Sequence, residues 1–75
     1  MNLYLLSQHQ NNWYDTFDSL VVAAKDEESA RNIKPSSRDW GCDWAYSPDQ
    51  VTVEFIGKAI KGTLEGVVLS SFNAG

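Results

Sequence analysis

Few side chains in this sequence have the types and spacing that catalysis requires. His9 and Cys42 are the one histidine and the one cysteine of the chain. A nucleophilic pair would need them to meet in space, with a third group to orient the imidazole. The neighbours of His9 are two glutamines, which are not such groups, and the carboxylate of Asp43 disfavours the thiolate that Cys42 would need. We therefore expect no catalytic residues and predict that the protein is not an enzyme.

Signatures of metal or cofactor binding are also missing from the sequence. A calcium-binding loop needs alternating oxygen ligands closed by a distant glutamate, and the spacing of three aspartates does not match it: Asp39, Asp43 and Asp49. The glycines of the C-terminal third match neither a phosphate-binding loop nor a dinucleotide fingerprint. We expect no metal and no cofactor.

Composition narrows the class of protein further. A chain of 75 residues with 43% hydrophobic and 12% aromatic residues predicts one folded domain, residues 1–75. One cysteine excludes an internal disulfide, and no apolar run approaches the ~20 residues of a membrane span, so we expect a cytoplasmic protein without membrane contact. The net charge is −4 and the six basic residues are scattered, which disfavours direct binding of nucleic acid.

The segment 17–35, FDSLVVAAKDEESARNIKP, organises the expected fold. Its apolar run 20–24 is typical of a strand with at least one buried face. Asp26 can cap a helix over about residues 27–34, and the two glutamates that follow it complement the positive end of the helix dipole. Pro35 ends the helix. The segment thus predicts a strand followed at once by a short helix.

Three further strands are expected, at residues 2–8, at 51–55 and at 67–72, with a bulge or bend at 56–57. The fold class is therefore α+β. We predict a four-stranded antiparallel sheet of order 2-1-3-4, connected β-β-α-β-β, with one short helix on one face. One short helix cannot cover both faces of such a sheet. The other face must be shielded by residues 36–49, SSRDWGCDWAYSPD, which we call the Trp-rich loop, by a second copy of the chain, or by a partner.

Aromatic side chains in the connectors are the best candidates for binding. Trp13 and Tyr14 lie beside a polar turn, where we expect them to be exposed and to act with Asp15 as anchors for a basic partner. A second group occupies the Trp-rich loop, although Trp40 and Trp44 are expected to roof the sheet and supply missing core. The candidate partner-binding residues are Trp13, Tyr14, Asp15, Asp39, Trp40, Asp43 and Trp44.

Two segments resemble parts of small phage-encoded accessory proteins: LVVAAKDEESARNI and the terminal GVVLSSFNAG. The order hairpin, short helix, hairpin in a small acidic chain is similar to the build of several anti-CRISPR proteins. The resemblance implies an inhibitor that occupies a surface of a host defence complex. It is a resemblance of build, and it carries over no functional residue.

We accordingly expect a small acidic inhibitor from a phage or mobile element, which binds a host protein or protein complex in the host cytoplasm and occludes its surface. Two alternatives belong to other classes. One is a module that sequesters a small molecule in a pocket between protomers, lined by Trp40, Cys42 and Trp44. The other is a regulatory subunit that forms a homodimer through its sheet.

Overall fold

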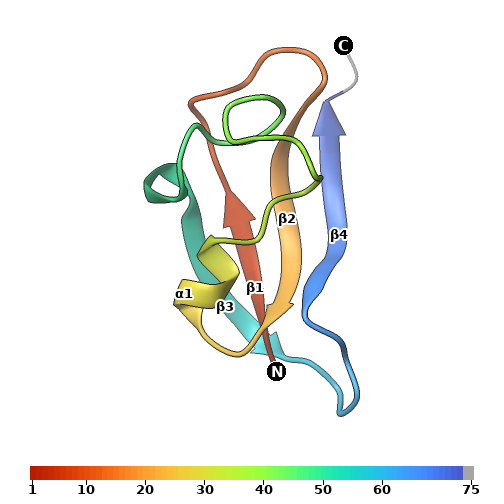
Figure 1. Ribbon diagram of the computed structural model, residues 1–75. Helices are drawn as coiled ribbons and strands as arrows, with labels where there is room; N and C mark the ends of the chain where they lie inside the picture. The colour runs from red at the N-terminus through yellow and green to blue at the C-terminus, as the bar shows by residue number, and fades with distance from the viewer. Residues whose placement is uncertain (74–75) are drawn as a thin grey trace.

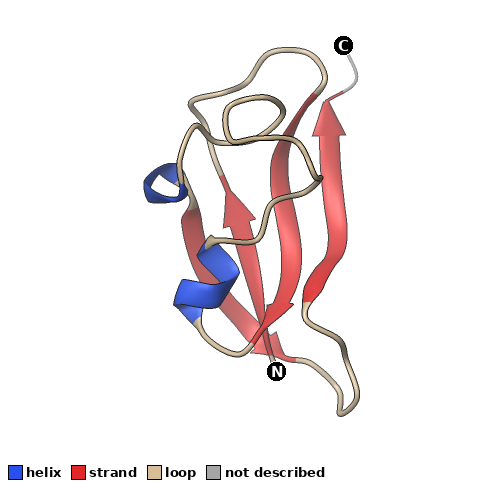
Figure 2. Ribbon diagram, viewed as in Figure 1, coloured by secondary structure: helices blue, strands red, loops and turns tan. Residues whose placement is uncertain are grey.

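The computed structural model describes residues 1–73 as one four-stranded sheet with a short helix and a long loop on one side (Figure 1). Figure 2 shows the strands forming one layer behind the helices and loops. The elements are β1 Asn2–Ser7, β2 Thr16–Ala24, α1 Glu27–Arg31, the 3-10 helix η1 Pro48–Gln50, β3 Thr52–Lys58 and β4 Gly66–Asn73. Neighbouring strands are antiparallel, in the order β3-β1-β2-β4.

The α+β class and the antiparallel sheet are confirmed, and β1 lies between β2 and β3 as expected. The predicted order 2-1-3-4 is wrong for the last strand, because β4 pairs with β2 on the far side of the sheet. The segment 59–65 is too long for a tight hairpin turn and carries the chain across the end of the sheet. Along this path the Ala59 N–H donates to the Met1 carbonyl oxygen (3.0 Å).

Pairing with β2 gives β4 apolar cross-strand neighbours. Val21 lies opposite Leu69, and the rings of Phe17 and Phe72 are 4.7 Å apart between centroids. The free edge of β3 offers Glu54 instead, a charged residue that is exposed. Since cross-strand pairs of apolar side chains stabilise a sheet, the edge of β2 is the better partner for this uncharged strand.

The helix begins as predicted and ends earlier. The Asp26 side chain accepts a hydrogen bond from the Ser29 N–H (2.8 Å), which confirms the cap. Helix α1 ends at Arg31 and does not reach residue 34, because Asn32 leaves helical geometry and the Ile33 N–H bonds back to the Ala30 carbonyl. The Arg31 guanidinium also donates to the carbonyl oxygens of Pro48 and Val51, which ties the helix end to the start of β3.

The core lies on the face that α1 covers. Alternate residues of β1 and β2 point into it, and the long loop between α1 and β3 closes it with Trp44, whose side chain is fully buried. The Trp-rich loop therefore roofs the same face as the helix, and not the opposite face as we expected. The buried cluster comprises Tyr4, Leu6, Leu20, Val22, Ala24, Ala30, Trp44, Ala45 and Val51.

The bulge predicted at residues 56–57 is confirmed. Leu3 of β1 pairs with Gly57 and Tyr4 pairs with Phe55, so Ile56 has no partner in the ladder. Gly57 has a φ of 157°, and the added residue bends β3 at this point.

Asp26→Asn should remove part of the acid sensitivity of the fold. The N–H of Ser29 lowers the pKa of Asp26 below its ordinary 3.8 by hydrogen bonding to the carboxylate. This contribution is complete above pH 3.8 and is lost as the pH falls through the lower folded-state pKa. Asparagine keeps a capping oxygen without titrating. Thermal melts across this range should therefore show a smaller acid-dependent loss in the variant, whereas Asp39→Asn, which removes no cap, should follow the parent.

Trp44→Ala should strongly destabilise the fold. Removing a fully buried indole leaves a cavity, and we expect a loss of about 3–5 kcal/mol in the free energy of unfolding. Trp40 is only partly buried against the same cluster, so Trp40→Ala should cost less. Denaturant unfolding of both variants would measure the difference, and equal losses would contradict the assignment of Trp44 as the central roof residue.

Candidate functional site

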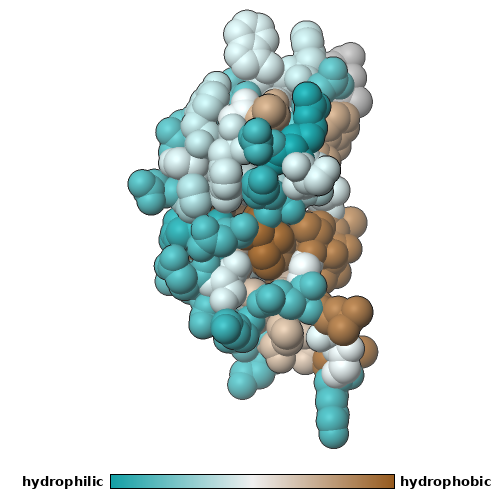
Figure 3. Space-filling model, viewed as in Figure 1, coloured by the Kyte–Doolittle hydropathy of each residue, from teal (hydrophilic) through white to brown (hydrophobic). Residues whose placement is uncertain are grey.

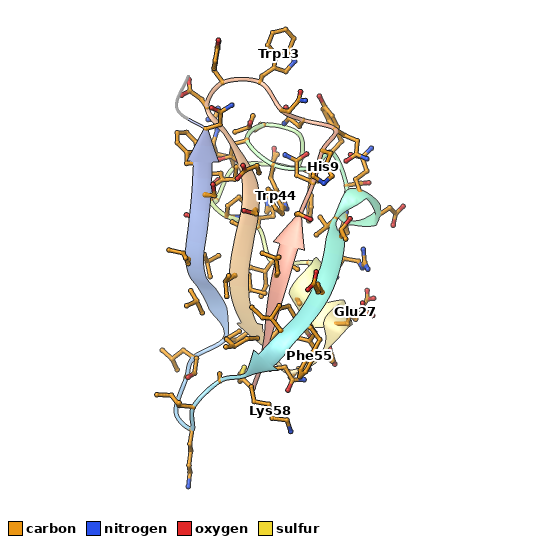
Figure 4. All side chains as sticks on the ribbon, turned by 180° about the vertical axis from the view of Figure 1, so that it is seen from behind. His9, Trp13, Glu27, Trp44, Phe55 and Lys58 are labelled. Atoms are coloured by element: carbon orange, nitrogen blue, oxygen red, sulfur yellow. The ribbon has the colours of Figure 1, made fainter. Side chains whose placement is uncertain are left out.

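The connector between β1 and β2 ends in Trp13, Tyr14 and Asp15, which we call the aromatic tip. The side chain of Trp13 is 75% exposed and that of Tyr14 is 71% exposed, as the sequence predicted. Figure 4 shows Trp13 projecting beyond the end of the sheet. Two large exposed aromatic side chains next to each other are the residue types that most often anchor a protein partner.

Two hydrogen bonds to backbone carbonyl oxygens hold the aromatic tip in place. The Thr16 hydroxyl donates to the Trp13 carbonyl oxygen (2.5 Å), and the Asp15 N–H donates to the carbonyl oxygen of Asn73 at the end of β4 (2.6 Å). Asp15 has a φ of 61°, a left-handed conformation that aspartate tolerates better than most residues. The tip is thus a tight turn fixed to the sheet at both sides.

Two buried amide side chains hold the rest of the connector. The Gln8 amide donates to the carbonyl oxygens of Asn11 (2.6 Å) and Phe17 (2.8 Å), and its oxygen accepts from the Asn11 N–H (2.9 Å). The Asn11 amide donates across to the Trp-rich loop, to the carbonyl oxygens of Trp44 (2.8 Å) and Gly41 (3.1 Å). Asn11 therefore joins the connector that carries the tip to the loop that closes the core.

The structure removes two of the seven candidates from the contact surface. Trp44 is fully buried, and its indole N–H lies in the core without a hydrogen-bond partner among the described residues. Asp43 is 5% exposed and accepts a hydrogen bond from the Ser36 hydroxyl (2.7 Å). The indole of Trp44 supplies apolar area to the core, and the carboxylate of Asp43 bonds within the Trp-rich loop. Because both side chains are buried, neither can contact a partner.

Asp39 and Trp40 remain available at the same end of the molecule. Asp39 is exposed, and Trp40 is partly buried, with the Lys34 ammonium 6.0 Å from the centre of its ring. Asn11 bonds to Gly41, the next residue of this loop, so the loop is fixed beside the connector that leads to the tip. Asp39 and Trp40 can therefore contribute only to the margin of the binding surface, whose centre is Trp13 and Tyr14.

We call the face of the sheet opposite the core the open face. No helix or loop of the described residues 1–73 lies over it (Figure 4). One row across it is aliphatic on three strands, where Leu5 pairs with Val21 and Val21 with Leu69, and ends on β3 in Glu54, the partner of Leu5. The next row toward the aromatic tip carries a hydroxyl on every strand. This row consists of Thr52, Ser7, Ser19 and Ser71 in spatial order. The open face is thus a flat surface with apolar and hydroxyl rows side by side.

A shallow depression lies on this face, between Leu5, Val21 and Leu69 of the aliphatic row and the serines beside them. Its volume is about 70 Å³, far below the roughly 300–1,000 Å³ of ordinary ligand sites. The pocket imagined for a sequestered small molecule is contradicted at Trp44, which is in the core and cannot line a space between protomers.

His9 and Cys42 are both exposed, and no three metal-binding side chains gather within residues 1–73. In the same part of the chain, no helix has the length and apolar character for crossing a bilayer.

Sequence reasoning missed the amides of Gln8 and Asn11 and the hydroxyl row. Alternation could have indicated that Ser7 and Ser19 share a face with Leu5 and Val21. Nothing local distinguishes the buried Asn11 from the exposed Asn12 beside it.

Asn11→Ala should destabilise the fold, because it removes the hydrogen bonds between the connector that carries the aromatic tip and the Trp-rich loop. It leaves two carbonyl groups without their donor, at a cost of about 1–3 kcal/mol in the free energy of unfolding. Asn12→Ala is the matched control, because Asn12 is exposed, and should change stability by less than ~0.5 kcal/mol. Chemical denaturation of the two variants measures both values, and equal effects would contradict the role given to Asn11.

Comparison of the chain with protein-family models, with curated proteins and with solved structures found no match. Function must therefore be inferred from the surfaces that the fold presents.

Proposed function

We propose that the protein works by binding another protein, as a small inhibitor that occludes a surface of its target. The observation that carries this proposal is the aromatic tip: Trp13 and Tyr14 are exposed on a turn that hydrogen bonds hold at both sides. Anchors already ordered in the free protein lose little conformational entropy on binding, which favours affinity.

The acidic side chains near the tip indicate the character of the partner. Asp15 belongs to the tip, and Asp18 is exposed at the start of β2. The whole chain has a net charge of −4. Complementary charge mainly accelerates encounter and excludes wrong partners, while buried aromatic groups supply most of the affinity. A basic patch with room for two aromatic rings is therefore the surface that this tip fits.

The target class follows from the resemblance to phage-encoded accessory proteins. On that ground we propose a bacterial defence protein or complex in the host cytoplasm as the target, with a CRISPR effector the first to test. Such effectors carry positively charged channels for nucleic acid, and an acidic protein with aromatic anchors could cover the mouth of one.

The test of the proposal is target binding by variants of the tip. Trp13→Ala and Tyr14→Ala should each weaken binding by about 2 kcal/mol or more, as hot-spot residues do, while the melting temperature stays near that of the parent. Phe55→Ala is the control, because Phe55 is 55% exposed and lies near the other end of the sheet (Figure 4). It should retain binding. Purified effector complexes and calorimetry would give the affinities, and differential scanning would give the melting temperatures.

A cellular assay provides the matching readout of inhibition. In cells with an active CRISPR system, expression of the parent or of Phe55→Ala should raise the plating of targeted phage above that of cells without the protein. Expression of Trp13→Ala should raise it less than the parent does. If all variants bind and protect phage equally, the tip is not the contact surface. If the parent neither binds an effector nor changes phage plating, the proposed target class is wrong.

A further inference from the structure

Strand β4 is the least covered element of the molecule. From Val67 to Asn73 every residue is exposed, and its apolar side chains include Leu69 at 67% and Val68 at 56% exposure. The core layer of α1 packs on β1, β2 and β3. Figure 3 shows apolar surface gathered on the side of the molecule where Figure 1 places β4.

The outer edge of β4 is also unpaired and unprotected. Within residues 1–73 the only strand that pairs with β4 is β2, so one row of its backbone N–H and C=O groups faces outward. Natural edge strands are commonly guarded by lysine, by proline or by inward-pointing charge. The strand GVVLSSFN has none of these. The ladder with β2 shifts register twice, at Val68 of β4 and at Asp18 of β2, so residues 69–73 of β4 themselves contain no extra residue.

Charge is distributed in a way that singles out this strand. All ten acidic and six basic residues of the chain lie between Asp15 and Glu65, so β4 carries no charge. Two copies of a chain with net charge −4 repel one another over most of their surfaces. Along β4 they can approach with no charged side chain on either strand.

We propose that β4 is a self-association edge, on which two copies pair their β4 strands antiparallel and form a continuous eight-stranded sheet. An antiparallel pair of identical strands satisfies two-fold symmetry, because each copy offers the same row of donors and acceptors to the other. This surface meets the aromatic tip at Asn73, whose carbonyl oxygen accepts from the Asp15 N–H, and its pairing needs no target protein.

A second copy is a better occupant than a strand of a different protein. A basic partner, which the acidic surface would attract, finds no charge on β4 to select it. Two β4 strands can pair without charge recognition, because each presents the same row of backbone donors and acceptors and the same uncharged side chains.

The test is the oligomeric state of a matched pair of serine variants. Ser71→Lys puts a charge on the exposed middle of the edge, where a second lysine from the other copy would oppose it. Ser37→Lys makes the same chemical change on an exposed serine of the Trp-rich loop. Sedimentation velocity from micromolar to millimolar concentration should show a dimer for the parent and for Ser37→Lys. For Ser71→Lys the dissociation constant should rise roughly tenfold or more.

Hydrogen exchange identifies the surface that associates. Amides of β4 should become protected as the parent is concentrated, and should lose that protection in Ser71→Lys. Val68→Lys, at the bulge, provides a second edge variant if Ser71→Lys melts below the parent. A parent that is monomeric throughout overturns the proposal. So does a dimer that leaves the β4 amides exchanging freely, since that outcome places the contact away from the β4 edge. Protection of β4 only on addition of a target protein would assign the edge to that protein and equally overturn self-pairing.

Discussion

The burial of Trp44 against the sheet is the contact on which the rest of the structure depends. Helix α1 spans only Glu27–Arg31, so it cannot cover the core by itself. The indole supplies the missing apolar area, and a fully buried aromatic ring of this size is among the largest single contributions that a small core can have. The indole N–H has no hydrogen-bond partner among the described residues, a cost that the packing of the ring outweighs.

This contact also positions the candidate functional surface. The loop that carries Trp44 is held by the Asn11 side chain, and Asn11 belongs to the connector that ends in the aromatic tip. The residues that close the core and the residues that display Trp13 and Tyr14 are therefore parts of one hydrogen-bonded unit. A loop without regular structure thus acts as scaffold, which agrees with the rarity of long unstructured loops in small domains that have no such role.

Because helix and loop gather on one side, the molecule has unequal faces. The core side is closed over β1, β2 and β3, whereas the open face presents its aliphatic and hydroxyl rows directly. Strand β4 lies beyond the covered region and has no charge. In so small a domain the ratio of surface to volume leaves too little chain to cover everything. The uncovered surfaces are where binding can evolve without loss of the core.

The sequence by itself determined the elements whose signals are local. The alternation of β1, the apolar run of β2, the Asp26 cap and the bulge near Gly57 all follow from neighbouring residues, and the structure confirms them. The exposure of Trp13 and Tyr14 was predictable for the same reason, since they adjoin a polar turn. Local rules could place these residues because their environments are set by the chain immediately around them.

Tertiary structure alone decided the position of β4, the face that Trp44 covers and the burial of Asn11 and Asp43. Each depends on the path of a whole connector or on partners distant in sequence, as the Asn11 bond to Trp44, separated by 33 positions, illustrates. The preference for joining consecutive strands favoured a β3–β4 hairpin, but β4 gained apolar neighbours by pairing with β2. Which arrangement has the lowest free energy depends on the whole chain, so it cannot be inferred from one segment of the sequence.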